Sequence, residues 1–160
     1  MTPTPPFRDY KTFTRALAAK AVGPADPRYN LLYFYGDSEA VHRLLGEIAA
    51  EHVRRHNSQN LVSVSAKQFT FELSDAIRRG RQEAFRQKYR ACGLLLLDRL
   101  QDAEGKPATM EELYHVIDRL YLQKVRLVFG ADRPPRDILA LDDRLRAYLE
   151  SGLLCDIDAE

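Results

Sequence analysis

The sequence contains five short runs that are almost entirely apolar and rich in Val, Leu, Tyr and Phe. They are Leu31–Tyr35, Leu61–Ser65, Gly93–Asp98, Val125–Gly130 and Leu153–Ile157. A strand that is apolar at nearly every position is buried on both faces, as in a parallel sheet with helices above and below it. The segments between the runs have helical periodicity, so the pattern predicts an α/β fold with a five-stranded parallel sheet.

The segments between the predicted strands indicate where the helices lie. Ala40–His56 has apolar residues at helical spacing, and a further helix is predicted near Tyr10–Ala21. Lys67–Arg79 and Gln82–Arg90 predict two helices separated at Gly80, where a simple crossover between strands needs only one. The second helix between these two strands therefore requires an explanation.

Two later segments carry signals for helix starts. Thr109-Met-Glu-Glu112 has the spacing of a capping box and predicts a helix from there to about Gln123. Arg133-Pro-Pro135 predicts extended backbone followed by a short helical start, and Asp142–Glu150 predicts the last helix.

The size and charge of the chain limit its class. A chain of 160 residues is expected to form one globular domain that buries about 70% of its unfolded surface. The formal charge of +1 argues against a generally basic nucleic-acid coat protein, so any charged site is local. No apolar stretch is long enough to cross a bilayer and Met1–Phe7 has no apolar signal core, which predicts a cytoplasmic protein. Cys92 and Cys155 lack CxxC or Cys/His spacing, so we expect reduced core thiols, with neither a disulfide nor a metal site.

Chemistry is expected just after the strands, because ligands of open parallel sheets bind beyond the carboxyl ends of strands. The first strand is followed by Gly36-Asp37-Ser38-Glu39-Ala40-Val41-His42-Arg43. A phosphate loop requires several glycines, a Lys for the phosphates and a Ser or Thr for magnesium. Here Asp37 and Glu39 bring negative charge and no Lys follows, so the segment predicts no triphosphate cradle. His42 lies where it could touch an anion, but an exposed helix histidine is the favoured interpretation.

The third and fourth strands end near acidic residues. Leu94-Leu95-Leu96-Leu97-Asp98 has the pattern that can hold magnesium beside a nucleotide, but without a phosphate loop a turn-capping role of Asp98 is favoured. Arg99 places a cation where a second carboxylate would help to activate water. Asp132-Arg133 is either a pair of polar sensing residues or a salt-bridged turn, and the pattern does not separate the two.

The two helices of the insertion carry a basic segment. Between positions 78 and 90 the only acidic residue is Glu83, and the basic residues are Arg78, Arg79, Arg81, Arg86, Lys88 and Arg90. Cationic and aromatic residues together suit single-stranded nucleic acid, and Phe69, Phe71, Phe85 and Tyr89 lie in the same helices. The alternative is favoured, in which the aromatic residues face the core and the basic residues are solvated.

The C-terminal end has the opposite charge. Residues 142–160 carry Arg144 and Arg146 against Asp142, Asp143, Glu150, Asp156, Asp158 and Glu160. Oppositely charged ends are compatible with head-to-tail self-association.

Several further segments recur in the order and spacing of one known family. They are Lys67–Arg79, Glu83–Arg90, Leu94–Gln101, Ala131–Pro135, Leu141–Arg146 and Gly152-Leu153. They resemble the AAA+ domain of the bacterial replication initiator DnaA. The resemblance implies a P-loop NTPase-like three-layer sandwich over residues 1–160, and the paired-helix insertion of replication initiators and loaders explains the extra helix. Because the sequence ends near Glu160, neither the helical lid nor the helix-turn-helix DNA-binding domain of the family is expected.

The resemblance also implies a nucleotide site, but in a degenerate form. The family's glycine-rich loop aligns with the segment after Gly36, where His42-Arg43, or Val41-His42 after a one-residue gap, takes the place of Lys-Thr. Asp98 is similar to the magnesium-associated acid and Asp132 to the first sensor.

Other family positions are altered as well. Arg144 matches a family arginine, but Arg99 replaces the catalytic acidic neighbour and Tyr148 stands at the position similar to the arginine finger. Such a finger contributes ~10³ to 10⁵ in rate where it operates. We therefore expect no self-sufficient hydrolysis and no ATP or magnesium cofactor.

Three functions are compatible with these features. The leading hypothesis is a pseudo-ATPase that contacts a DnaA-type initiator, a helicase or related replication proteins and regulates them. The second is single-stranded DNA binding through Arg78, Arg79, Arg81, Arg86 and Lys88. The third, ranked last, is a residual ATP-binding initiator homologue that would rest on Gly36, Asp98 and Asp132.

Overall fold

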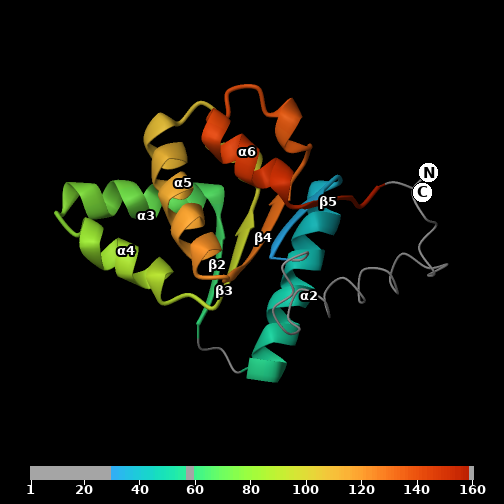
Figure 1. The fold of residues 1–160 in the computed structure, drawn as a ribbon, viewed down its shortest axis with the longest axis horizontal. Coiled ribbons are helices and arrows are strands. Elements are labelled where there is room, and N and C mark those ends of the chain that lie inside the picture. Colours follow the sequence, from blue (N-terminus) through green and yellow to red (C-terminus); the bar gives the residue numbers. More distant parts are fainter. Residues whose placement is uncertain (1–29, 57–59, 159–160) are drawn as a thin grey trace.

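The computed structural model describes residues 30–56 and 60–158, which contain a parallel sheet of five strands in the order β2-β3-β4-β1-β5 (Figure 1). The strands are β1 (Leu31–Tyr35), β2 (Leu61–Ser65), β3 (Leu94–Asp98), β4 (Arg126–Ala131) and β5 (Leu153–Asp156). Each boundary lies within one residue of its predicted position. The predicted α/β class and the five-stranded parallel sheet are therefore confirmed.

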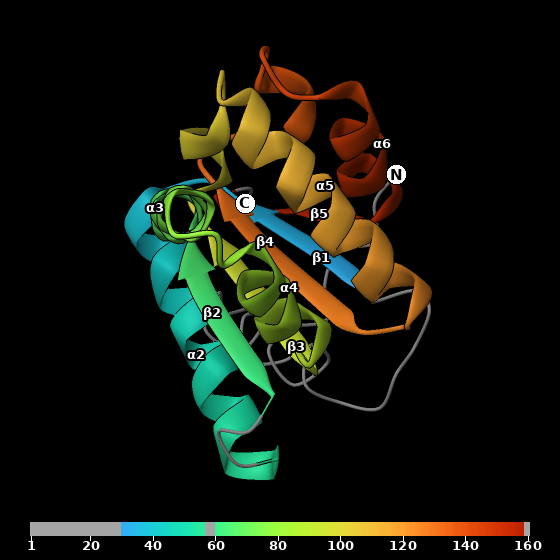
Figure 2. The ribbon, with the colours of Figure 1, turned by 90° about the vertical axis from the view of Figure 1, so that its left-hand side faces the viewer.

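Helices cover both faces of this sheet. They are α2 (Ser38–His56), α3 (Ala66–Arg78), α4 (Gln82–Arg90), α5 (Pro107–Leu122) and α6 (Asp143–Ser151), with the 3₁₀ turns η2 (Leu100–Ala103) and η3 (Pro135–Asp137). Figure 2 shows α2 on one side of the sheet and α5 and α6 on the other. Alternate side chains of β1 point to opposite faces of the sheet. Phe34 packs in the core beneath α2, and Tyr33 packs in the larger core beneath the other helices. The helix predicted near Tyr10–Ala21 lies outside the described residues.

The predicted helix pair between β2 and β3 is present as α3 and α4. Gly80 separates the two helices with a φ of +66°, a left-handed conformation that glycine adopts without a Cβ penalty. Phe69 packs against Phe85 and Tyr89, with ring centroids 5.3 and 5.4 Å away. The prediction that the aromatic residues face the core holds for these three, but Phe71 is 67% exposed.

The predicted capping box at Thr109 is wrong. Helix α5 begins at Pro107, because the fixed φ of proline suits the first helical position. Thr109 is instead buried within the helix, with its hydroxyl 3.0 Å from the hydroxyl of Thr70. Glu112 does not cap the helix and accepts hydrogen bonds from Arg86 on α4.

The last strand departs from the expectation that every strand is covered on both faces. β5 pairs only with β1 among the described strands, and Leu153 is 36% exposed. Its Cys155 is half-buried, whereas Cys92 is buried, and neither forms a disulfide. Burial raises the pKa of both thiols to about 11, so both are protonated at neutral pH.

Gly130 in β4 marks a close approach of α2 to the sheet. A Cβ there would lie 2.6 Å from Cγ1 of Val41 and 2.8 Å from Oδ1 of Asp98. We expect Gly130→Ala to lower the free energy of unfolding by about 1–3 kcal/mol through over-packing. Gly46→Ala, in open space on α2, is the matched control and should raise it by about 0.5–1 kcal/mol. Urea denaturation measures both changes, and equal changes would contradict the close approach.

Candidate functional site

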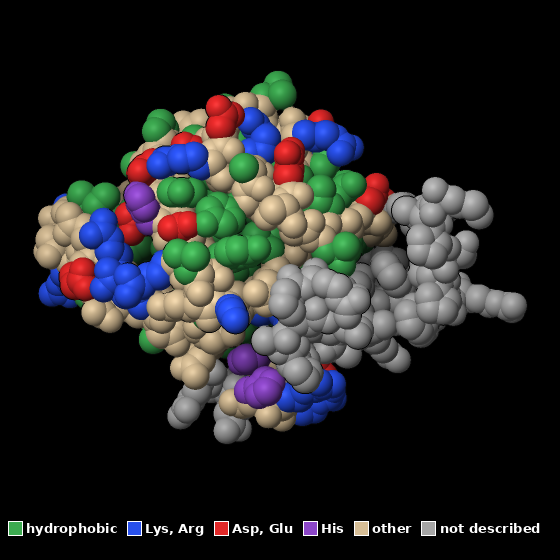
Figure 3. Space-filling model, viewed as in Figure 1, with side chains coloured by type: hydrophobic (Ala, Val, Ile, Leu, Met, Phe, Trp, Pro, Cys, Tyr) green, Lys and Arg blue, Asp and Glu red, His purple; other side chains and the backbone are tan. Residues whose placement is uncertain are grey.

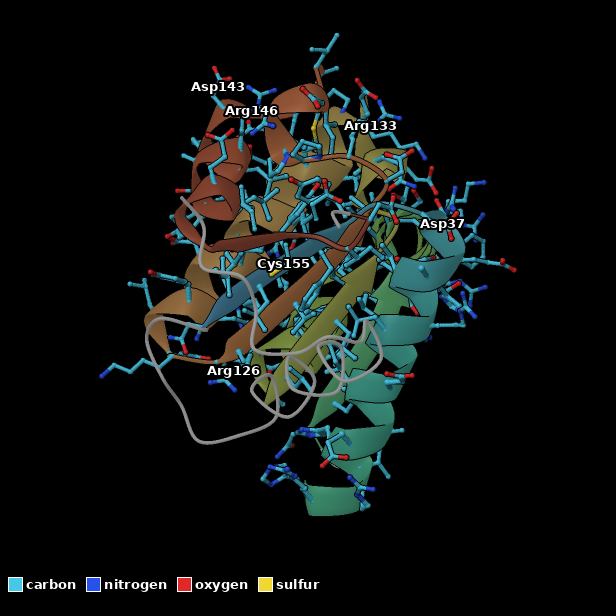
Figure 4. All side chains as sticks on the ribbon, turned by 90° about the vertical axis from the view of Figure 1, so that its right-hand side faces the viewer. Asp37, Arg126, Arg133, Asp143, Arg146 and Cys155 are labelled. Atoms are coloured by element: carbon cyan, nitrogen blue, oxygen red, sulfur yellow. The ribbon has the colours of Figure 1, made fainter. Side chains whose placement is uncertain are left out.

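The carboxyl ends of β1, β3 and β4 meet at one edge of the sheet, where the predicted site residues follow them. The backbone N–H of Gly36 donates to the carbonyl of Ala131 at 3.3 Å, which joins the turn after β1 to the end of β4. Figure 4 shows Asp37 at the start of α2 and Arg133 beyond β4, both toward this edge. The structure therefore brings the predicted nucleotide-site positions together.

The turn between β1 and α2 is closely covered by the segment that follows β5. Gly36 has a φ of +141°, which side chains rarely adopt. A Cβ on Gly36 would lie 2.7 Å from Oδ2 of Asp158 and 2.8 Å from Cγ1 of Ile157. The space over this turn is thus filled by the chain itself.

Two carboxylates accept hydrogen bonds from the backbone at this helix start. The N–H of Asp37 donates to Oδ2 of Asp158 at 2.8 Å. Oδ2 of Asp37 in turn accepts from the N–H of Ala40 at 3.0 Å, the bond of an N-capping side chain. A helix N-terminus attracts anions, and here that attraction is satisfied by negative charges of the protein.

His42 and Asp98 form a pair across this edge. Nδ1 of His42 lies 2.9 Å from Oδ2 of Asp98. The imidazole is 80% exposed, whereas the carboxylate is 14% exposed, so the histidine covers the acid from the solvent side. Arg43 is exposed, and its side chain forms no hydrogen bond or ion pair within the described part of the chain.

The other oxygen of Asp98 has a structural partner. Oδ1 accepts from the N–H of Arg99 at 2.8 Å, which is the turn-capping contact favoured from the sequence. Arg99 has a φ of +55° and its Nε donates to Asp102 at 2.9 Å. That hydrogen bond raises the pKa of Arg99, so its charge is fixed beside Asp98. Across residues 30–56 and 60–158, no three His, Cys, Asp or Glu side chains cluster as a metal site would require.

Asp132 and Arg133 form the salt-bridged turn that was one of the two sequence interpretations. Nε of Arg133 donates to Oδ1 of Asp132 at 2.8 Å. The Arg133 carbonyl accepts from the hydroxyl of Tyr33 at 2.7 Å, and burial raises the pKa of that tyrosine. The N–H of Asp132 donates to the buried side chain of Gln101 at 3.2 Å. Gln101 and Asp158 hold the edge together, and neither was predicted as a site residue.

Comparison with known sequences assigns the chain to a family. The bacterial DnaA ATPase domain matches residues 10–156. The chain belongs to the bacterial DnaA family. The chromosomal replication initiator protein DnaA of Symbiobacterium thermophilum is 39% identical over 142 residues, which are 88% of this chain and 31% of that relative. The DnaA of Thermus thermophilus has the same identity over 142 residues, 33% of its length, so the chain spans about a third of these relatives.

Solved structures agree with this DnaA assignment. A replication initiator DnaA bound to AMPPCP and single-stranded DNA has a TM-score of 0.86 and 27% identity, over 92% of this chain and 46% of that one. The DnaC helicase loader has a TM-score of 0.71 over 98% of this chain and 95% of that one, but at 13% identity it shows the fold alone. The AAA+ architecture predicted from the sequence is confirmed. None of the described helices is long and apolar enough to cross a lipid bilayer.

Tyr148, which the sequence resemblance aligns with the DnaA arginine finger, forms contacts through both its hydroxyl and its ring. The Tyr148 hydroxyl donates to Oδ1 of Asp118 on α5, and this hydrogen bond raises the tyrosine pKa to about 12. Its ring packs against Tyr121 and Tyr114, with centroids 5.4 and 5.9 Å apart. A neutral phenol at this position supplies no positive charge.

The DnaA-like helix insertion carries the basic segment, and most of its charges are paired. Figure 3 shows basic side chains over the α3–α4 end of the molecule with acidic ones among them. Four of the five predicted residues bind carboxylates: Arg78 and Arg79 bind Asp75, Arg86 binds Glu112 and Lys88 binds Glu72. The side chain of Arg81 forms no hydrogen bond or ion pair with the described residues. The charge pattern within positions 78–90 overestimated the local positive charge, because three of the acids lie outside that range.

The hydrogen bond between Asp158 and the turn before α2 should contribute measurably to the stability of the fold. We expect Asp158→Ala to lower the free energy of unfolding by about 1 kcal/mol, because the Asp37 N–H loses its acceptor. Glu150→Ala on α6 removes the same charge from an exposed side chain that has no hydrogen-bond partner in residues 30–56 and 60–158, and it should change the free energy of unfolding by less than about 0.5 kcal/mol. Urea denaturation compares the two variants. An unchanged free energy of unfolding in Asp158→Ala would contradict a stabilising hydrogen bond between Asp158 and Asp37.

Proposed function

We propose that this DnaA family member is a pseudo-ATPase that acts as a protein-interaction module in replication initiation. The observation that carries the proposal is the pair of carboxylates, Asp37 and Asp158, at the start of α2. A phosphate charge 4 Å from one such carboxylate is repelled by about 4 kcal/mol near a protein surface. That energy corresponds to roughly a thousandfold in affinity, and no lysine in the turn offsets it.

The magnesium side of the same edge supports the proposal. Both oxygens of Asp98 already have partners, His42 and the Arg99 N–H. A second acid beside Asp98 is replaced by the Arg99 cation, which would repel a divalent ion. These residues do not fit a magnesium nucleotide, and the proposed function requires none.

The proposed partners follow from the relatives. The matched relatives are chromosomal replication initiators, and one fold neighbour is a helicase loader. A chain that keeps this fold without a nucleotide can still present the surfaces by which such proteins associate. We propose a DnaA-type initiator or a replicative helicase as the partner, with regulation by association.

Calorimetric titration tests the absence of nucleotide binding. We expect no saturable heat when ATP and magnesium are added to the chain. The variant Asp98→Asn, which lacks the family's magnesium-associated charge, should give the same flat titration. Micromolar affinity that Asp98→Asn abolishes would overturn the proposal.

A second candidate function is single-stranded DNA binding by α3 and α4. One observation favours it: Phe71 is 67% exposed on α3, and an exposed aromatic ring provides a stacking surface for a base. The DnaA structure bound to single-stranded DNA is 27% identical to this chain. The pairing of Arg78 and Arg79 with Asp75 weighs against it, since those charges are already neutralised.

The role of Asp75 separates this candidate from the first. If the basic segment binds DNA, Asp75→Asn should strengthen binding of a single-stranded oligonucleotide by about threefold to tenfold, because it releases two arginines. Neutralising Arg78, Arg79 and Arg81 together should abolish binding and its salt dependence. Fluorescence anisotropy at low salt measures both, and the proposed function predicts no binding by any of these proteins.

A further inference from the structure

A pocket of about 60 Å³ lies between α4 and α5, on the side of the sheet opposite α2. Its floor consists of Tyr89, Val116 and Leu120 and is apolar apart from the Tyr89 hydroxyl. All three residues are buried. On the same measure a single water molecule requires only about 10–15 Å³, so the pocket has room for the end of one aliphatic side chain.

The rim of this pocket is basic. Arg86, Arg90, His115 and Arg119 line it, against one acid, Glu112. Glu112 is 8% exposed, and its two oxygens accept from Nε and Nη2 of Arg86 at 3.0 and 3.3 Å. The single negative charge is therefore already neutralised within the wall.

The other two arginines of the rim are available to a ligand. Arg119 is exposed, and its side chain forms no hydrogen bond or ion pair with the described residues. Arg90 and His115 pair with Glu83 and Glu111, which are 65% and 50% exposed. Exposed ion pairs of this kind contribute only about 0–1 kcal/mol, so an incoming carboxylate exchanges with them at little cost.

We propose that this pocket binds an acidic peptide segment of a partner protein, in which one aliphatic residue enters the pocket and flanking Asp or Glu residues pair with Arg119 and Arg90. This inference rests on the proposed function, because it names the chemistry of the partner. The buried apolar floor favours a peptide over a nucleic-acid backbone, which has no aliphatic group to place there.

The segment Asp156-Ile157-Asp158 of a second copy does not supply this ligand, because Ile157 is buried in the α2 core and Asp158 holds the α2 turn. The proposed occupant is a different protein, and a dimer in sedimentation is the outcome that would assign the acidic segment to a second copy instead.

Binding of a labelled peptide tests the proposal. The probe is fluorescein-labelled Asp-Asp-Leu-Asp-Asp, and two control peptides replace the Leu by Ser or every Asp by Asn. We expect saturable anisotropy with the probe, and a loss of about tenfold in affinity with each control peptide. Arg119→Glu should weaken binding by about tenfold, whereas Arg136→Glu, the same charge change at an exposed arginine on η3, should alter it by less than about twofold.

Several outcomes would overturn the assignment. Two concern the peptides: no saturable binding of the probe, or equal binding of the Ser peptide. The other two are competition by a single-stranded oligonucleotide for the site at Arg119, and a dimer in sedimentation that Arg119→Glu dissociates. None of them tests nucleotide binding, so failure of the pocket and failure of the pseudo-ATPase proposal are distinguishable. Circular dichroism of both arginine variants confirms that the fold is kept.

Discussion

The position of β1 between β4 and β5 is the constraint on which the rest of the structure depends. Pairing with β4 brings the turn after β1 beside the end of β4, and pairing with β5 brings the chain after Asp156 over the same turn. Both contacts are parallel, so three strand ends lie at one edge. The side chains at that edge are therefore set by sheet order, although they are far apart in the sequence.

This order explains why an internal carboxylate reaches a helix start. The backbone N–H of Ile157 donates to the Tyr35 carbonyl at 2.9 Å, which continues the pairing of β5 with β1 by one residue. The next residue, Asp158, then lies against Gly36, where a glycine leaves space for its carboxylate. The attraction of a helix N-terminus for an anion is thereby met within the chain, which makes the start of α2 stable without a bound anion.

The sequence was sufficient to predict the architecture because buried parallel strands and helix pairs have strong patterns. The apolar runs predicted every strand that the structure describes, and Gly80 predicted the break between α3 and α4. Local patterns failed where a stronger local or tertiary effect decided. Pro107 began α5 before the capping-box residues, and the edge position of β5 left Leu153 exposed despite its apolar sequence.

The candidate site was only partly predictable for the same reason. Positions after strands predicted His42, Asp98 and Asp132 at one edge, since that follows from parallel topology. The contact of Asp158 with Asp37 spans 121 residues and depends on the register of β5, which no local pattern contains. A signal was nevertheless present in the sequence. Asp158 follows the last predicted strand, and in a parallel sheet the residues that follow each strand lie at the same end of the sheet.

The proposed function has a consequence for the conformational behaviour of the molecule. A nucleotide shifts a conformational equilibrium only by its different affinities for two states, so a chain that binds none cannot be switched by it. The hydrogen bonds at this edge, from Asp37 to Asp158 and from His42 to Asp98, are internal to the chain, so under the proposed function they do not change with the nucleotide supply. Under this proposal the module presents one constant surface, and its regulation of replication proteins depends on its concentration and on its partner's state.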